Sequence, residues 1–450
     1  MKKPSSSRRD FLKTSALAGG LLLLPSGFLR GQNAPSNRLN YAAIGVGGMG
    51  GADTGGISGQ KGVQLVGLCD VDKERLDGAL RKYTPRFPKV RGFRDYRELL
   101  EKLGKDIDAV SVSTPDHTHF TAAYSAVELG KHVYVQKPLC HTISQVRRLS
   151  AKAAANKVVT QMGNQGSSSA HTRLAREWFE AGLLGNVKEV AAWSDRPIWP
   201  QGMKDYRPVK PVPEKLGDDG WDLWLGPAKF LDYRDGLHAF AWRGYYAFGC
   251  GALGDMAIHL MYDAYYALGL TAPTKIEVSN ITGASDIAYP LTSNITFHFP
   301  ATERSKNPVK FTWYDGRGSN NRPQSPNGQG LPGNGSVLYG DKIALSVSGW
   351  GNEFKPLLKE GEERPKNPPK KYERVRGGHY ANWVNGILKG EELSSSFDKS
   401  GPFAEVILLG VIASRLKRTL TWDAKSGTFT GDDEANALVK GGVPRAGFKA

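Results

Sequence analysis

Cysteine is scarce in this sequence. Cys69, Cys140 and Cys250 are the only three among 450 residues. Their odd number and the lack of a C-x-x-C pair argue against a disulfide-bonded framework and against a zinc ribbon. Each cysteine stands in an apolar or glycine-rich stretch, so we expect three buried thiols.

Acidic residues are outnumbered by basic ones, 44 to 60, which leaves a formal net charge of +16. Six basic residues and one acid fall within residues 1–34, and the remaining excess is scattered along the chain. The sequence contains no Arg/Lys-dense helix and no nucleic-acid-binding module, so no nucleic-acid partner is expected. A solvated basic surface is the preferred interpretation. The length favours two domains, and a hydrophobic content of 40% is typical of a globular protein.

The sequence gives no support for a membrane span. The apolar run at residues 14–24 is too short to cross a bilayer core of ~30 Å as a helix. It follows the basic stretch S-R-R-D-F-L-K at residues 7–13, which resembles the twin-arginine export signal. The resemblance implies that residues 1–34 are a signal peptide, cleaved between Gly27 and Ser36, and that the chain reaches the periplasm through the twin-arginine translocase. A disordered basic tail is the alternative.

Glycine, by contrast, is plentiful, and one glycine cluster follows a predicted strand. Residues 41–44 form an apolar run typical of a buried strand, and residues 45–50 read G-V-G-G-M-G. In a dinucleotide-binding G-x-G-x-x-G loop, Gly45 would permit the tight turn, Gly47 would let the backbone approach a pyrophosphate, and Gly50 would let the helix pack close to the strand. The pyrophosphate would lie on the N–H groups that begin the following helix.

A second predicted strand, residues 63–69, ends on Asp70, twenty positions after Gly50. A carboxylate at this position accepts hydrogen bonds from both ribose hydroxyls and repels a 2′-phosphate, so NAD is favoured over NADP. The glycines alone could form a structural turn. The order of strand, glycines, strand and acid favours dinucleotide binding.

Strands and helices alternate through the rest of this region. Helices are expected at residues 72–82, 95–103 and 120–129, and strands at residues 107–113 and 132–135. The alternation predicts a doubly wound parallel sheet with right-handed crossovers. Ligands of such sheets bind beyond the carboxyl ends of the strands. The glycine loop, residues 114–119 and residues 136–138 should therefore meet in one crevice.

Three further motifs follow in a distinctive order. They are T-P-D-H-T-H at residues 114–119, G-K-H-V-Y-V-Q-K-P-L at 130–139 and G-A-L-G-D-M-A-I-H at 251–259. With the glycine loop, they resemble the Gfo/Idh/MocA oxidoreductases, the family of glucose–fructose oxidoreductase and inositol dehydrogenases, and most of all its exported bacterial branch. The resemblance covers the chain after residue 38. It implies an NAD-binding Rossmann domain over residues 38–160 and a substrate-binding, catalytic α+β domain over residues 161–440.

The pattern changes in the second of these regions. Several predicted strands mix apolar and polar positions with period two, which predicts an open, mainly antiparallel sheet with one covered face. These strands are residues 186–195, 274–279, 293–299, 309–314, 336–339 and 343–347. The pattern matches the family's second domain. The expected fold class is therefore α/β, a Rossmann sheet followed by an α+β domain.

The resemblance also implies roles for residues at the crevice. In the family, a lysine in an E-K-P motif lies near the nicotinamide and the substrate; Lys137 and Pro138 match this motif, and Gln136 replaces the glutamate. A neutral neighbour would leave Lys137 less biased toward its charged form, which suits a general base or reflects a variant of the branch. The expected NAD contacts are Gly45, Gly47, Gly48, Met49, Gly50, Asp70, Thr114, Pro115, His117, His119, Gln136 and Lys137.

Asp255 and His259 stand four positions apart in a predicted helix and so share one face. A carboxylate beside an imidazole can orient the ring and support it as a proton acceptor. By resemblance, His259 takes the proton of the substrate hydroxyl, Asp255 holds His259, and Lys137 completes the catalytic set. The alternatives are an acid that begins the helix with an interior histidine, or a metal pair. Further ligands at convincing spacing are not found, so no metal is predicted.

Five of the ten tryptophans fall between residues 193 and 242. Residues 197–235 are rich in Pro, Gly and Asp and predict an ordered loop rather than a helix. Tryptophan faces suit the C–H faces of sugars, although any one of them could simply pack the loop, and Trp221 and Trp224 are expected to be structural. The substrate-contacting candidates are Gln165, Trp242, Arg243 and His259, with Asn164 and His379 as weaker ones.

The predicted function is an exported NAD-dependent oxidoreductase acting on a sugar or glycoside hydroxyl. Free NAD is scarce outside the cytoplasm and twin-arginine cargo crosses folded. NAD would therefore be bound before export, held tightly and recycled within one turnover. A redox-neutral NAD-dependent glycosidase of the same family, and a non-catalytic sugar-binding or sensor protein on the same fold, are the alternatives. The identity of the sugar and the oligomeric state stay open, and a homo-oligomer is compatible with the sequence.

Overall fold

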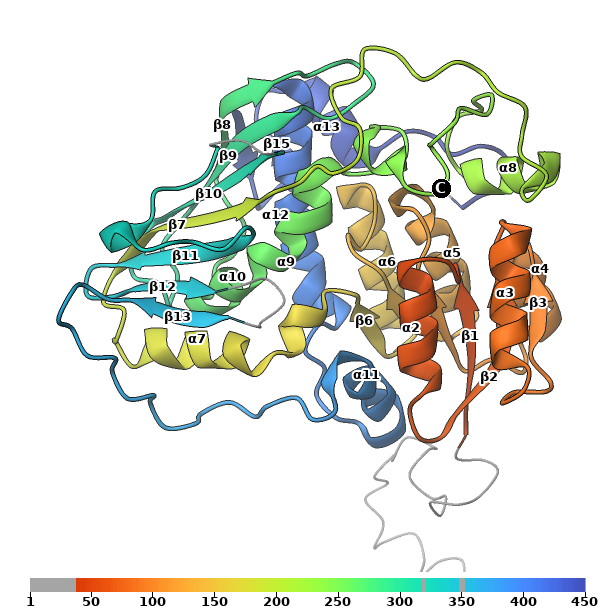
Figure 1. Cartoon of the computed structure of the whole chain (residues 1–450), viewed down its shortest axis with the longest axis horizontal. Helices are drawn as coiled ribbons and strands as arrows, with labels where there is room; N and C mark the ends of the chain where they lie inside the picture. Colours follow the sequence, from red (N-terminus) through yellow and green to blue (C-terminus); the bar gives the residue numbers. More distant parts are fainter. Residues whose placement is uncertain (1–37, 318–320, 348–352, 450) are drawn as a thin grey trace, which may run out of the picture. The chain divides into compact units, whose positions relative to one another are not determined.

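The first sheet consists of six parallel strands in the order β3-β2-β1-β4-β5-β6. The computed structural model describes residues 38–317, 321–347 and 353–449, so the signal peptide predicted at residues 1–34 lies outside the described residues. The strands are β1 (Leu39–Ile44), β2 (Val63–Cys69), β3 (Arg91–Phe93), β4 (Ala109–Val112), β5 (His132–Val135) and β6 (Thr160–Met162). The strand order reverses between β1 and β4, so the predicted doubly wound parallel sheet is confirmed (Figure 1).

Five helices connect these strands. They are α2 (Met49–Ser58), α3 (Lys73–Tyr83), α4 (Tyr96–Leu103), α5 (Asp116–Glu128) and α6 (Ile143–Ala155). Local sequence explains where several of them begin: the Asp72 carboxylate accepts hydrogen bonds from the N–H groups of Glu74 and Arg75, and Thr142 forms a reciprocal capping box with Gln145. These caps satisfy N–H groups that the first helical turn leaves without an intrahelical partner.

Two predicted boundaries differ from the structure. Helix α5 begins at Asp116, four residues before the start predicted at Phe120, because the polar T-P-D-H-T-H motif forms its buried first turn. The apolar periodicity on which the prediction depended starts only at Phe120. The domain boundary predicted after residue 160 falls inside β6, which is the sixth strand of the first sheet.

The second sheet has nine strands in the order β13-β12-β11-β7-β10-β9-β8-β14-β15. They are β7 (Val187–Ser194), β8 (Lys275–Thr282), β9 (Thr292–Phe299), β10 (Val309–Gly316), β11 (Gly335–Gly340), β12 (Ala344–Val347), β13 (Phe354–Leu357), β14 (Leu420–Asp423) and β15 (Thr428–Phe429). All pairs are antiparallel except β10 with β7. Burial alternates strictly along β9, as period-two patterning requires. The predicted fold class is confirmed.

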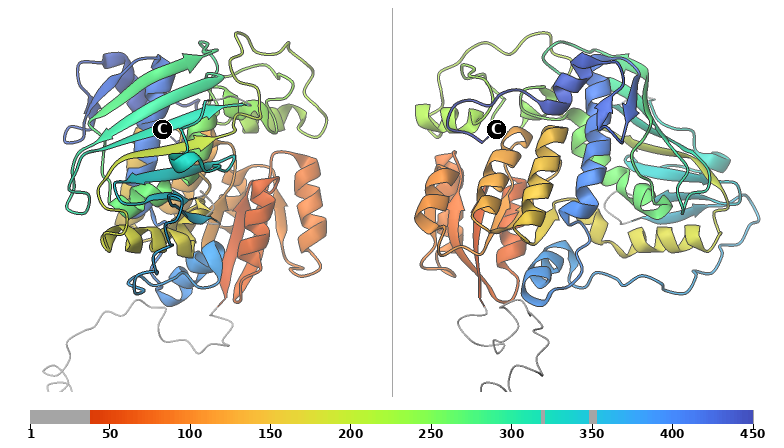
Figure 2. Two further views of the ribbon diagram at one scale, coloured as in Figure 1. Left: turned by 60° about the vertical axis from the view of Figure 1, so that its left-hand side comes forward. Right: turned by 180° about the vertical axis from the view of Figure 1, so that it is seen from behind.

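Helix α12 (Phe397–Leu416) joins the two domains. It packs against α6 on one side and against β8 and β9 on the other, and both figures show it between the two sheets (Figures 1 and 2). Phe403, Ile407 and Leu408 on this helix are almost fully buried. Each such side chain contributes ~1.5–3 kcal/mol of hydrophobic stabilisation, so the helix holds the domains together through its apolar core.

The other helices of the second domain are short. The α-helices are α7 (Ala170–Glu180), α8 (Gly217–Leu225), α9 (Ile258–Leu260), α10 (Tyr262–Leu268), α11 (Gly378–Lys389) and α13 (Asp433–Lys440). The 3₁₀ segments are η2 (Gln165–Ser168), η3 (Ala241–Gly244) and η5 (Pro326–Gly328), and η4 (Leu253–Ala257) is a π-helix. Within the described ranges, no helix combines the length and the apolarity needed to cross a membrane.

The segment predicted as a loop over residues 197–235 contains α8, so the prediction of no helix there was wrong. Trp221 and Trp224 lie on α8 and stack on each other with ring centroids 4.8 Å apart. Both pack into an apolar cluster that includes Tyr233 and Phe248. Tertiary packing of these aromatic rings therefore stabilises a helix that the Pro, Gly and Asp content of the segment did not indicate.

Candidate active site

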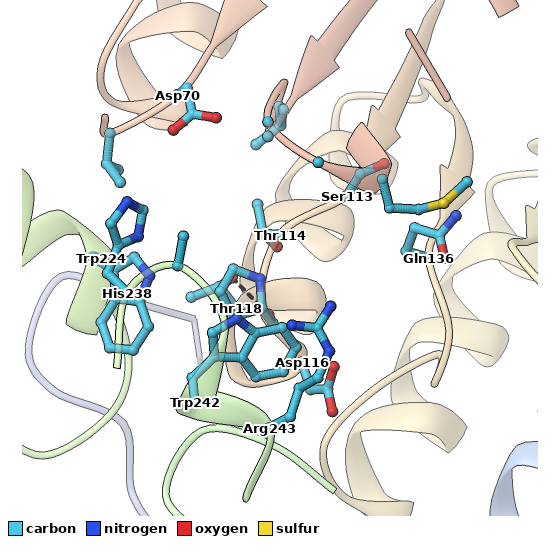
Figure 3. A pocket seen from close by; sticks show the side chains of 18 of the residues that line it. Asp70, Ser113, Thr114, Asp116, Thr118, Gln136, Trp224, His238, Trp242 and Arg243 are labelled. Atoms are coloured by element: carbon cyan, nitrogen blue, oxygen red, sulfur yellow. Dashed lines mark hydrogen bonds between the residues drawn. The ribbon is translucent and has the colours of Figure 1, made fainter. Parts of the chain in front are cut away.

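A cavity of about 590 Å³ lies beyond the carboxyl ends of the first sheet's strands. The segments that line it come from both domains and include the glycine loop, residues 113–116 with Thr118, residues 136–137, residues 198–199, residues 238–240, residues 242–243 and residues 255–256 with His259. Figure 3 shows Asp70 and His238 in one part of the cavity, and Asp116, Trp242 and Arg243 gathered in another. The three crevice segments expected from the sequence thus meet in one place.

The glycine loop is shaped for close backbone approach. Gly45 has a φ of +81°, and a Cβ there would come 2.5 Å from the carbonyl oxygen of Ser113. A Cβ on Gly50 would overlap the carbonyl oxygen of Gly45, so the start of α2 can pack against β1 only without a side chain. No side chain caps α2 at Gly48. This leaves the helix start open to a phosphate, so the loop fits a dinucleotide.

Asp70 follows β2 directly, and its carboxylate is fixed by two backbone groups. Val46 N–H donates to Oδ2 and Asp72 N–H donates to Oδ1, each at 3.0 Å. Asp70 is 7% exposed, and burial raises the pKa of its carboxyl. The side chain lines the cavity, where its remaining lone pairs can accept hydrogen bonds from ribose hydroxyls. Asp70 is the acid that the sequence analysis expects to favour NAD over NADP, and it lies at the cavity.

Two predicted cofactor contacts, His117 and His119, do not line the cavity. The two ring nitrogens of His117 lie 2.9 and 3.3 Å from the carbonyl oxygens of Trp224 and Phe248, and those of His119 lie 2.8 Å from the carbonyl oxygens of Pro138 and Thr114; each neutral ring has one N–H to donate to them. Burial lowers the pKa of both rings, to about 3 for His117 and about 4 for His119. These histidines connect segments behind the cavity wall, so the prediction that they contact the cofactor is not supported.

Their neighbour Asp116 lines the cavity and was missed by the sequence analysis. It is 5% exposed, and its Oδ2 accepts a hydrogen bond from Cys250 N–H at 3.1 Å. Burial raises the pKa of this carboxyl to about 7, against the opposing positive charge of Lys137. Its position as the single acid of the T-P-D-H-T-H motif could have indicated it. Asp116 is a group able to exchange a proton near neutral pH.

Lys137 is paired with Asp255. Its Nζ lies 2.8 Å from Asp255 Oδ1 and 2.9 Å from the Asp255 carbonyl oxygen. Arg243 Nε lies 3.4 Å from the same carboxylate oxygen. Although burial acts to raise the pKa of Asp255, the charges of Lys137 and Arg243 lower it to about 2. Lys137 therefore has an acidic neighbour, supplied by the second domain.

Asp255 has a second partner besides the expected His259. Asp255 lies in the π-helix η4 and His259 in the adjoining turn α9, and the Asp255 charge acts to raise the pKa of the His259 imidazole. Asp255 Oδ1 accepts hydrogen bonds from Lys137 Nζ and from Arg243 Nε. We therefore assign Asp255 to the positioning of Lys137.

His259 lines the cavity and is 6% exposed. Burial, followed by the positive charge of Lys137, lowers the pKa of its imidazole to about 3. The ring is therefore neutral at neutral pH. A neutral imidazole at the cavity has a ring nitrogen that can accept a proton, the role that the sequence analysis expects of it.

Gln136 faces a buried acid that the sequence analysis did not single out. Its Nε2 lies 2.9 and 3.1 Å from the carboxylate oxygens of Asp53 on α2. Asp53 is fully buried and also accepts hydrogen bonds from Ser113 Oγ at 2.7 Å and from Tyr380 OH at 2.9 Å. A glutamate at position 136 would set two carboxylates against each other. This explains the departure from the E-K-P motif.

The substrate candidates divide into two groups. Gln165, Trp242 and Arg243 line the cavity, and the Arg243 guanidinium lies 4.3 Å from the Trp242 ring centroid. His379 and Asn164 do not line it: the His379 ring bonds to the Met162 carbonyl and to Ser168, and Asn164 accepts from Ser395.

The three cysteines are free and buried, as expected. Among the residues that the structure describes, no group of three or more His, Cys, Asp or Glu side chains is arranged to hold a metal ion.

Comparison with known proteins agrees with this geometry. Residues 39–164 match the model of the oxidoreductase family with the NAD-binding Rossmann fold, GFO_IDH_MocA, and residues 178–300 match the C-terminal alpha/beta domain of the same family. A Glycosyl hydrolase family 109 protein of Solibacter usitatus is 33% identical over 159 residues, which cover 31% of this chain and 34% of that protein. An inositol 2-dehydrogenase of Salmonella typhimurium is 29% identical over 103 residues, covering 23% and 29%. The chain thus matches about a third of the length of these curated relatives.

Two solved structures share the fold. The WlbA dehydrogenase of Bordetella pertussis, in complex with NADH and UDP-GlcNAcA, superposes with a TM-score of 0.59 at 16% identity, covering 86% of this chain and 99% of that one. A levoglucosan dehydrogenase in complex with NADH and levoglucosan gives 0.56 at 17% identity, covering 85% and 98%. The two family models match one domain each, and the glycine loop, Asp70 and the Lys137 motif all lie within the region that the first model matches. The chain belongs to the Gfo/Idh/MocA oxidoreductase family, and its first domain is the family's NAD-binding Rossmann domain.

Proposed function

We propose that this chain is an NAD-dependent oxidoreductase that acts on a CH–OH group of a sugar or glycoside. The observation that carries the proposal is one cavity in which the dinucleotide loop, Lys137 and His259 meet. The loop and Asp70 would hold NAD, which supplies a hydride acceptor or donor when bound. Inositol and levoglucosan dehydrogenases among the relatives support a polyhydroxylated substrate.

The chain's own residues then have defined tasks. His259, neutral because burial lowers its pKa to about 3, accepts the proton of the reacting hydroxyl. Lys137 donates a hydrogen bond to the reacting oxygen and stabilises its developing negative charge. Asp255 holds Lys137 in place through its 2.8 Å ion pair. Trp242, a wall of the same cavity, offers an aromatic face to the sugar's C–H groups.

Export and cofactor retention belong to the same proposal. The twin-arginine motif at residues 7–13 supports transfer to the periplasm by the twin-arginine translocase. A protein that works there must carry its NAD with it, so tight retention and recycling within one turnover follow from the two motifs taken together.

A second candidate function is a redox-neutral glycosidase, in which oxidation is followed by elimination, hydration and reduction. Relatives from Solibacter usitatus, Shewanella pealeana and Akkermansia muciniphila are named as Glycosyl hydrolase family 109 proteins, which favours this candidate. It uses the same His259 and Lys137, and it also requires that NAD stay bound.

The test begins with exhaustive dialysis of the purified protein, followed by an absorbance spectrum in the reduced-nicotinamide band. Retained nucleotide whose absorbance changes on addition of sugars or glycosides is expected. A protein that needs added NAD(H) for each turnover would contradict retention, and bound nucleotide that responds to no sugar would favour the sensor alternative. His259→Ala should abolish turnover while bound NAD remains, and full activity of this variant would remove His259 from the mechanism.

A further inference from the structure

The end of the cavity near Asp70 is the adenosine end, because this carboxylate marks the ribose position. On the first domain, its wall continues from Asp70 through Val71, Tyr96 and Thr118. The facing wall is built from residues that are remote in sequence: Trp224, Gly226, His238 and Phe448. The adenosine end is therefore covered by parts of the chain outside the Rossmann domain.

The first covering part is the segment around α8. His238 Nε2 lies 2.9 Å from Asp72 Oδ2, and the Lys73 N–H donates to the Lys215 carbonyl oxygen at 2.9 Å. Arg94 donates to the carbonyl oxygens of Val71 and Leu216 and so ties the end of β2 to this segment. The side chain of His238 is only 4% exposed. These contacts are partly buried, and together they attach this part of the cover to the end of β2 and the start of α3.

The second covering part is the segment 441–449, which follows α13. Arg445 donates to Asp222 Oδ1 at 2.6 Å and to the Gly226 carbonyl oxygen at 2.9 Å, both at α8. Lys449 pairs with Glu128 of α5 at 2.9 Å. Arg97 of α4 donates to the Gly447 carbonyl oxygen at 3.3 Å. Charged, partly exposed contacts thus attach the segment both to α4 and α5 of the first domain and to α8 of the cover.

Phe448 is the residue of this segment that reaches the cavity. The Arg97 guanidinium lies 4.7 Å from its ring centroid on one side. The ring also lies beside Gly226, where an added Cβ would be in ordinary van der Waals contact with Phe448 Cε1 at 3.9 Å. An aromatic ring held in this way offers an apolar surface to a purine at the adenosine end.

We propose that the segment 441–449 forms the outer wall of the adenosine subsite, with Phe448 packed against the adenine, so that the dinucleotide leaves only when this segment detaches from α4, α5 and α8. The proposal rests on the proposed function, because it supplies the means of cofactor retention. Surface ion pairs hold the segment, so its attachment weakens with ionic strength and NADH release becomes faster in high salt.

The experiment measures the rate at which NADH leaves the full-length protein, by stopped-flow fluorescence after mixing with excess NAD⁺. Phe448→Ala should release NADH at least about tenfold faster, which corresponds to the loss of one aromatic contact with a base. Val443→Ala is the matched control, because Val443 lies in the same segment but is 91% exposed. It should release NADH at the wild-type rate. Removal of residues 441–450 should accelerate release at least as much as Phe448→Ala.

Thermal melting shows first that each variant is folded. Wild-type release rates in both Phe448→Ala and the shortened chain would overturn the proposal, and so would equal acceleration by Val443→Ala. Failure of the proposed function has a different signature. If the wild-type chain binds no NADH, the proposed NAD-dependent function is wrong. If it binds NADH but turns over no sugar, the effect of Phe448→Ala on NADH release can still be measured.

Discussion

Gln136→Glu tests the interpretation of the altered E-K-P motif. The substitution keeps the size of the side chain but replaces the amide donor that now lies 2.9 and 3.1 Å from the Asp53 carboxylate oxygens. Asp53 is fully buried and burial already raises the pKa of its carboxyl. The variant therefore either holds two carboxylate charges in contact or binds a proton that the wild-type site does not need.

The magnitude follows from the distance and from the pH. Two unit charges ~3 Å apart repel by roughly 5 kcal/mol at an effective dielectric constant of about 20. Binding one proton at pH 8 to a carboxyl of ordinary pKa about 4 costs a similar amount, at about 1.4 kcal/mol per pH unit. We expect a loss in the free energy of unfolding of about 4 kcal/mol at pH 8 and about 1 kcal/mol at pH 5.

The sign can be checked by proton linkage. The folded variant binds one more proton than its unfolded chain above pH ~4, so its stability relative to the wild type must fall as the pH rises. Urea denaturation of variant and wild type at pH 5 and pH 8 measures this difference. Gln136→Met, which removes the donor without adding charge, should lose about 1–3 kcal/mol equally at both pH values.

The double variant Asp53→Asn with Gln136→Glu is the critical test, because it restores a carboxylate–amide pair with the amide now at position 53 and the carboxylate at position 136. It should recover most of the stability lost at pH 8. A loss that is equal at pH 5 and pH 8, or a double variant as unstable as the sum of its single variants, would refute the charge pairing.

Three further outcomes are expected. Asp70→Ser should raise the affinity for NADPH relative to NADH at least about tenfold in titrations, because the carboxylate that repels a 2′-phosphate is gone and Arg75 lines the same cavity; an unchanged ratio would contradict the role of Asp70. Burial raises the pKa of Asp116 to about 7, so the carboxylate form predominates only above this pH, and Asp116→Asn should remove an inflection near pH 7 from the profile of kcat/KM; the reasoning fails if the inflection persists. Trp242→Ala should raise KM for the sugar about tenfold with NADH affinity unchanged, whereas parallel losses in both would indicate a structural role.

Short-range patterns explain what could be predicted. The strands at residues 39–44 and 63–69, the glycines between them and Asp70 form one contiguous stretch whose geometry is set by neighbours in sequence. This stretch, together with the order of the later motifs along the chain, predicted the Rossmann sheet, the NAD site and the position of Lys137 at the crevice. Twin-arginine export stays a prediction, because residues 1–34 lie outside the described residues.

Polar contacts between remote residues could not be predicted. His117 and His119 were expected at the cofactor, but their rings lie against carbonyl groups as far as 131 positions away. Asp255 was expected to hold His259, and its ion pair with Lys137, 118 positions away, was not indicated by the spacing of the motif. Helix α8 forms because its two tryptophans stack in an apolar cluster.

The sequence by itself thus determined the first domain's fold, the cofactor class and the crevice at which the chemistry takes place. Only the tertiary structure decided which side chains meet: Asp53 with Gln136, Asp255 with Lys137, and Phe448 with the cavity. The physical reason is that a buried polar or aromatic group is stabilised by whichever partner reaches it in space. Neither periodicity nor local propensity contains that partner's position.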